Sequence, residues 1–261
     1  MNRALLSAVL LVMTLAAVVA ATGSASATHS WGGYHWARTS NPFTLKLGNN
    51  TSGTWTGLLG TVSTDWTKSD VLDTLIVTGG TKAKVCRPTS GRVEVCNASY
   101  GNTGWLGVAQ IWISGGVHIT QGTVKNNDYY FGSSTYTYNN ENEKLHVICQ
   151  EVGHTLGLDH QSTDGSSQNT CMDYYHNTKE DVDKSTHPNQ HDYDELGIIY
   201  GHLDSSTTIA RSPAAAAAAA VLDAPGEWGR QVAASGDGRS ATYERDFGGG
   251  NKVVTFVIFA Q

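Results

Sequence analysis

The spacing of apolar residues along the chain predicts several strands and helices. Residues 43–47 alternate between apolar and polar side chains, which is typical of a strand with one buried face. Apolar residues from Trp55 to Trp66 recur at helical spacing, and further strands are predicted at 73–78, around 106–113 and around 117–120. A later amphipathic helix is predicted by Tyr193, Leu196, Ile199, Tyr200 and Leu203.

A further helix is predicted over residues 145–156, and its two faces differ in chemistry. At about 100° per residue, Gln150, Glu151 and His154 fall on the side opposite an apolar stripe. We therefore expect one face to lie in the core and the other to face a cleft. Gly157 can take a positive φ without strain, so the helix can end there and the chain can turn back to bring His160 toward His154. The apolar stripe consists of Leu145, Ile148, Cys149, Val152 and Leu156.

The segment from residue 150 to residue 160 resembles the zinc signature of metzincin metalloproteases. That signature reads H-E-x-x-H-x-x-G-x-x-H and is followed by a methionine turn. The chain has Glu151, His154, Gly157 and His160 at the same spacing, and Cys171-Met172-Asp173-Tyr174 follows downstream. Gln150 stands where the signature has its first histidine.

The resemblance implies an α+β fold of the metzincin-like, two-subdomain kind, with a twisted mixed sheet above an active-site helix. It also implies that Gln150, His154 and His160 hold Zn²⁺ while Glu151 acts as general base. Met172 would form a hydrophobic base under the metal. Tyr174 stands where astacins supply a tyrosine to the metal or the oxyanion, and a merely packed or exposed tyrosine is the alternative.

The clan also binds its substrate backbone by strand addition to an edge strand above the helix. By resemblance, the strand at 116–123 is the candidate for this edge, with an ordinary structural strand as the alternative. A C-terminal hairpin is predicted where residues 240–247 and 251–260 flank Gly248-Gly249-Gly250. Because a lone hairpin is marginal in water, we expect it to dock on the main domain or to bind something else.

The chemistry of Gln150 can be argued in two directions. A neutral amide oxygen leaves the net charge of the site positive, so a bound zinc ion could still acidify water. An amide oxygen is, however, a poorer ligand than imidazole, so metal affinity should fall. His146, His118 and His176 are the alternative ligands that could replace it.

The start of the chain and its cysteines indicate export. Residues 1–27 contain Arg3, a long apolar run and Ala25-Ser26-Ala27, which predict a signal peptide cleaved after Ala27, with an uncleaved anchor as the alternative. Four cysteines in an oxidising compartment predict two disulfides, with three possible connectivities. Cys86 and Cys96 flank a short turn and are the natural local pair, which leaves Cys149 with Cys171.

Charge and composition restrict the partners. The formal net charge is −6, and no cluster of Lys and Arg suggests a nucleic-acid surface. We expect a monomer that acts on a protein or peptide substrate, with no stable membrane association after signal cleavage. The predicted organisation is a signal peptide at 1–27, a catalytic domain at 28–205, an alanine-rich linker at 206–224 and a hairpin segment at 225–261.

These features favour a secreted, zinc-dependent endopeptidase. No cysteine lies between Ala27 and the first predicted strand, which excludes cysteine-switch latency and predicts activity once the chain is exported. Two other functions stay open. One is a catalytically impaired metzincin relative that binds peptides or surfaces, as Gln150 suggests, and the other is a structural or interaction protein that uses its β-tail.

Overall fold

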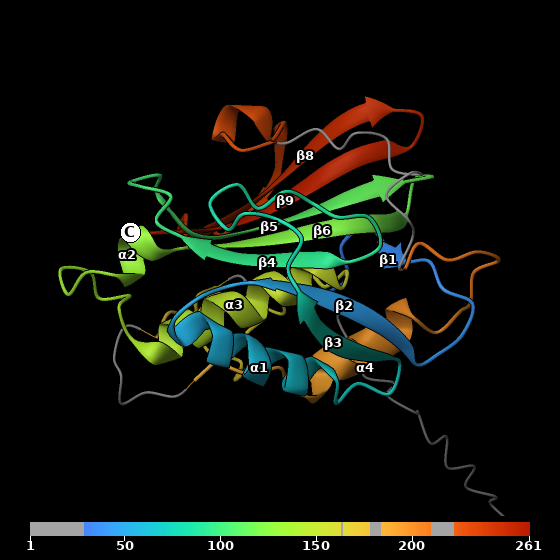
Figure 1. Cartoon of the computed structure of the whole chain (residues 1–261), viewed down its shortest axis with the longest axis horizontal. Helices are drawn as coiled ribbons and strands as arrows, with labels where there is room; N and C mark the ends of the chain where they lie inside the picture. Colours follow the sequence, from blue (N-terminus) through green and yellow to red (C-terminus); the bar gives the residue numbers. More distant parts are fainter. Residues whose placement is uncertain (1–28, 163, 178–183, 210–221) are drawn as a thin grey trace, which may run out of the picture.

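The computed structural model describes residues 29–162, 164–177, 184–209 and 222–261. Within these residues the chain forms a mixed α/β fold with a large mixed sheet and few helices (Figure 1). The predicted signal peptide and most of the predicted linker lie outside the described residues.

In the described part of the chain, nine strands form the sheet in the order β3-β2-β4-β6-β5-β9-β8-β7, and β1 pairs with β6. The strands from β3 to β6 are parallel, and those from β6 to β7 are antiparallel. The strands are β1 (His35–Trp36), β2 (Phe43–Asn50), β3 (Leu72–Thr78), β4 (Val93–Ala98), β5 (Trp105–Ser114), β6 (His118–Asn127), β7 (Arg230–Ala234), β8 (Ser240–Gly248) and β9 (Asn251–Phe259).

The longer helices lie on one side of the sheet (Figure 1). Asn140 caps the N-terminus of α3, and its side chain accepts a hydrogen bond from the Glu143 backbone amide. No helix in the described residues combines the length and apolar content needed to cross a membrane. The helices are α1 (Thr54–Trp66), α2 (Asp128–Phe131), α3 (Glu141–Thr155) and α4 (Gln190–Ile199), with a short 3₁₀ turn η2 (Pro225–Glu227).

Apolar side chains fill both faces of the sheet at β5 and β9. The larger cluster lies between the sheet and α1 and α3, and the smaller one lies on the opposite face under Leu222 and Trp228. Because side chains alternate along a strand, β9 contributes to both clusters. It contributes Val254, Phe256 and Ile258 to the helix side, and Val253 and Val257 to the other side.

Most of the predicted elements are confirmed. The strands expected at 43–47, 73–78, 106–113 and 117–120 are β2, β3, β5 and β6, and the three expected helices are α1, α3 and α4. The last of these ends at Ile199, so the predicted Leu203 lies outside it and is exposed. β4 is not among the predicted strands, because it begins inside the loop closed by Cys86–Cys96, where a turn is predicted.

The interpretation of residues 116–123 as an edge strand is wrong. This strand is β6, which pairs with β4 on one side and with β5 on the other. The alternative, an ordinary structural strand, is therefore correct. The predicted hairpin is confirmed as β8 and β9, and it docks on the main sheet through antiparallel pairing of β9 with β5.

Both predicted disulfides, Cys86–Cys96 and Cys149–Cys171, are present in the structure. The second joins the buried side of α3 to the segment that contains Met172. Gly153 on α3 lies directly against the Sδ atom of Met172 and the ring of Trp66. A side chain at this position would collide with both. The disulfide and this contact together hold the methionine turn against α3.

Removing the Cys149–Cys171 disulfide by Cys149→Ala and Cys171→Ala should lower the free energy of unfolding by about 3 kcal/mol, because the bridge restricts the unfolded chain. Urea denaturation measures the loss. Removing Cys86–Cys96 should cost a similar amount, but only the first change should speed hydrogen exchange at the Met172 amide. Equal exchange at Met172 in both variants would show that the disulfide does not hold the methionine turn.

Candidate metal and catalytic site

His154 and His160 meet at the end of α3, as the sequence predicts. Their Nε2 atoms lie 3.1 Å apart. Gly157 makes this possible, because its φ of 100° turns the chain back after the helix. The backbone oxygen of Tyr34 lies so close to Gly157 that no side chain would fit there.

The other nitrogen of each imidazole faces an oxygen atom. The Nδ1 atom of His154 lies 2.9 Å from the Leu158 carbonyl oxygen, and that of His160 lies 3.2 Å from Asp159 Oδ1. Since each of these contacts needs an N–H donor, the Nε2 atom of each neutral ring keeps its lone pair. The repulsion of two lone pairs that face each other at this distance is removed by a proton shared between the rings or by a metal cation between them.

The geometry of this histidine pair fits a zinc ion. Tetrahedral zinc with Zn–N bonds of about 2.0–2.1 Å separates two nitrogen ligands by roughly 3.3 Å, close to the observed distance. Burial is the main cause that lowers the pKa of His154 well below its ordinary value, and the nearby His160 lowers it further. A neutral ring is the form that binds a metal.

Gln150 is held by the methionine turn. Its amide nitrogen donates hydrogen bonds to the carbonyl oxygens of Cys171, at 2.7 Å, and Asp173, at 2.5 Å. Its amide oxygen is buried and has no hydrogen-bond partner in the described part of the chain. A buried acceptor without a partner is costly, so this oxygen is the atom of Gln150 that could serve a cation.

Glu151 is fully buried, next to β5. Its carboxylate lies against Gly107, where any side chain would collide with it. Neither oxygen makes a hydrogen bond of good geometry within the described residues. Burial raises the pKa of Glu151 well above its ordinary value, and the backbone amide of Ala109 offsets this only in part.

Tyr174 lies beside the histidine pair. Its ring centroid is 4.1 Å from that of His160, at an interplanar angle of 45°. Burial raises the pKa of its hydroxyl far above the ordinary value, and Ser240 on β8 opposes this shift. The five residues that the sequence predicts for the site, Gln150, Glu151, His154, His160 and Tyr174, therefore lie on α3 and on the two segments that follow it.

The expectation that α3 presents this face to a cleft is wrong, because the methionine turn covers Gln150, β5 covers Glu151 and β9 covers His154. The ring of Phe256 stacks on His154 with a centroid distance of 4.1 Å and an interplanar angle of 4°. Phe256 is paired with Ala109 of β5, directly above α3. His160 is the most exposed of the predicted site residues, at only 6%.

Sequence reasoning did not find Phe256 as part of this site. The apolar run within 251–260 and the glycines before it indicate a strand of a hairpin, but they do not say where that strand docks. The three alternative metal ligands are engaged elsewhere: the Nδ1 atoms of His146 and His176 contact Ser185 O and Glu143 Oε1, and His118 contacts Asp204.

Comparison of the chain with known protein families and with curated proteins finds no match. The case for a function therefore rests on the residues of this site and on their geometry.

We predict that the double variant His154→Ala, His160→Ala binds one zinc ion fewer per chain than the wild type. Both histidines offer their Nε2 atoms to the same point, and alanine offers no ligand. Elemental analysis after purification without chelator, followed by zinc titration, measures the difference. The same zinc content in both proteins would exclude a metal at this histidine pair.

Gln150→His should bind zinc more tightly than the wild type, because imidazole is a better ligand than an amide oxygen. The variant should also lose about 1–3 kcal/mol of stability, since an imidazole cannot donate to both backbone carbonyls that Gln150 serves. Competition with a chromogenic chelator and thermal unfolding of the metal-free protein separate the two effects. Unchanged zinc affinity in Gln150→His would mean that residue 150 does not face the metal.

Proposed function

We propose that the chain is a secreted zinc-dependent endopeptidase of the metzincin kind. The observation that carries this proposal is the distance of 3.1 Å between His154 Nε2 and His160 Nε2. His154 shares α3 with Gln150 and Glu151, and His160 follows that helix. The disulfides, and the apolar segment within residues 1–27, support export. Met172, packed under α3, supports the resemblance to the clan.

In this proposal Gln150, His154 and His160 hold the metal. When bound, zinc lowers the pKa of a water molecule and polarises the substrate carbonyl. Glu151 takes the proton of the attacking water, and its burial beside β5 places it next to a substrate strand lying along that strand. Tyr174 would donate a hydrogen bond to the developing oxyanion, and its ring contact with His160 supports this role.

The substrate would add as a strand to β5, the place that β9 occupies in the structure. β9 runs antiparallel to β5, and its Phe256 lies on His154. The hairpin therefore acts as a cover that keeps the peptidase latent until β9 leaves β5. This differs from the expectation of immediate activity, because latency here comes from the C-terminal segment and needs no cysteine.

The alternative is a catalytically impaired relative that binds peptides or surfaces. A specific observation favours it: Gln150 is anchored by hydrogen bonds to the carbonyls of Cys171 and Asp173, so its amide has a structural role that needs no metal. In that case Phe256 would be a permanent part of the core, and Glu151 would have no reaction to serve.

Glu151→Gln separates these two functions. The comparison is made in the Phe256→Lys protein described next, in which β9 is released from β5. If Glu151 is the general base, adding Glu151→Gln to that protein should leave zinc binding unchanged while turnover falls by about 10²–10⁴-fold. Cleavage of an unfolded protein substrate, with and without chelator, measures the change. Equal and chelator-insensitive rates in the two proteins would contradict the peptidase.

Phe256→Lys tests the cover. A lysine ammonium cannot be buried against His154 without a desolvation cost of several kcal/mol, so β9 should leave β5 and cleavage should rise about tenfold or more. Phe247→Lys is the matched control, because Phe247 lies on β8 of the same hairpin and is 48% exposed. The added activity should vanish when Glu151→Gln is combined with Phe256→Lys. A folded, zinc-loaded Phe256→Lys protein without activity would favour the impaired relative.

A further inference from the structure

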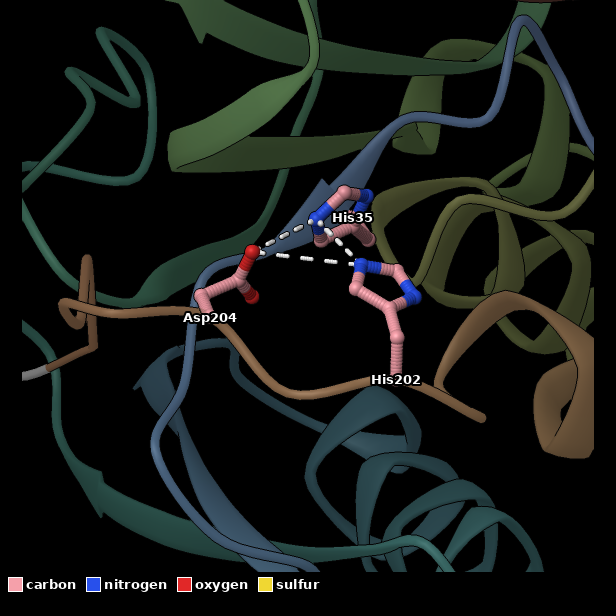
Figure 2. Close-up of side chains that lie close together, drawn as sticks. All are labelled: His35, His202 and Asp204. Carbon is pink, nitrogen blue, oxygen red and sulfur yellow. Dashed lines mark hydrogen bonds and ion pairs between the residues drawn. The ribbon is translucent and has the colours of Figure 1, made fainter.

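A second group of metal-binding side chains lies outside the candidate site. His35 comes from β1, and His202 and Asp204 come from the segment that follows α4. One ligand atom from each of these three side chains lies within 4.8 Å of the other two. Figure 2 shows the three side chains pointing toward one another. Their positions in the sequence carry no motif spacing, so only the fold brings them together.

The tautomer of His35 makes this cluster unusual. Its Nδ1 atom lies 2.8 Å from the carbonyl oxygen of Gly33, which can only accept a hydrogen bond. The neutral ring therefore has its lone pair on Nε2. That atom faces Asp204 Oδ1 at 3.4 Å and His202 Nε2 at 3.2 Å. A lone pair that faces a carboxylate oxygen is repelled unless a cation lies between them.

Asp204 is held with one oxygen toward the histidines. Its Oδ2 atom accepts hydrogen bonds from the Arg38 backbone amide, at 3.1 Å, and from Arg38 Nη1, at 2.9 Å. Its Oδ1 atom is left to face His35, His202 and also His118, whose Nε2 lies 3.2 Å away. The Arg38 side chain also donates to the carbonyl oxygen of His202. Arg38 thus positions both residues that the segment after α4 contributes.

We propose that His35, His202 and Asp204 form a zinc site that is separate from the candidate catalytic site. Two imidazoles and a carboxylate suit Zn²⁺ better than Mg²⁺ or Ca²⁺, which prefer oxygen ligands alone. The distances between the ligand atoms, 3.2–3.8 Å, lie near the roughly 3.3 Å that tetrahedral zinc requires.

One side of this zinc site is open to solvent. The side chain of His202 is 53% exposed, whereas those of His35 and Asp204 are 7% and 11% exposed. A water molecule can complete the coordination from the exposed side. His118 keeps Asp204 in place through its hydrogen bond and is expected to contribute less than the three ligands.

The bound metal would join two distant parts of the chain. His35 and His202 are 167 residues apart, so their link closes a long loop and restricts the unfolded chain. β1 and the segment before it also pack on the end of α3, because the Trp31 backbone amide donates to Gly157 O and Trp36 Nε1 donates to Thr155 O. The site therefore serves the stability of the fold and does not depend on the proposed peptidase activity.

The test uses the full chain carrying His154→Ala and His160→Ala, so that the candidate catalytic site cannot contribute. After removal of metal by chelator, this protein is titrated with Zn²⁺ and with Co²⁺, whose absorption reports on imidazole coordination. We expect one ion per chain and a rise in melting temperature on zinc binding. Adding His202→Ala should weaken metal binding by at least about tenfold and abolish that rise, because even outer-shell changes cost 10–100-fold in affinity.

His187→Ala is the matched control. Its side chain is 46% exposed, comparable to that of His202, and it contacts Asp65 elsewhere on the molecule. This change should leave metal binding intact. No metal uptake by the His154→Ala, His160→Ala protein, or equal uptake with and without His202, would overturn the proposal. In the first case a proton shared between His35 and Asp204 would explain the cluster.

Discussion

The surroundings of α3 and the apolar packing on both faces of the sheet depend on the backbone pairing between β5 and β9. Through this pairing β9 places Phe256 on His154 of α3, beside the part of β5 that covers Glu151. The same pairing also creates the second apolar cluster on the opposite face of the sheet. β9 contributes alternate side chains to both clusters, so a shift of its register by one residue would exchange its two faces.

The two candidate metal sites orient a histidine in the same way, but they differ in solvent exposure. In each, a backbone carbonyl fixes one nitrogen of an imidazole and leaves the other free, with Leu158 serving His154 and Gly33 serving His35. The first site is dry and lies under an aromatic ring, whereas the second lies near solvent beside an arginine–aspartate pair. Burial strengthens electrostatic interactions at the first site, whereas solvent weakens them at the second.

The features that could be predicted from the sequence depend on residues that are close together in the chain. Helical spacing places Gln150, Glu151 and His154 on one face of α3, the positive φ of Gly157 returns the chain to His160, and pairing by proximity yields both disulfides. The parts that escaped prediction depend on contacts between distant segments. Nothing in residues 251–259 indicates β5 as their partner, and nothing around His35 indicates His202. A strand pattern specifies which side chains share a face, but not which edge the strand will meet.

The place of β9 in the sheet also has a consequence for biosynthesis. Gln110 and Thr255 face each other across the β5–β9 ladder, yet they are 145 residues apart in the chain. While the protein is being synthesised, β5 is complete long before its partner exists, and its outer edge presents unpaired amides and carbonyls flanked by Trp105, Val108 and Trp112. Such an edge is a template for pairing with other chains. During synthesis, this edge of β5 therefore stays without its native partner until residues 251–259 have been made.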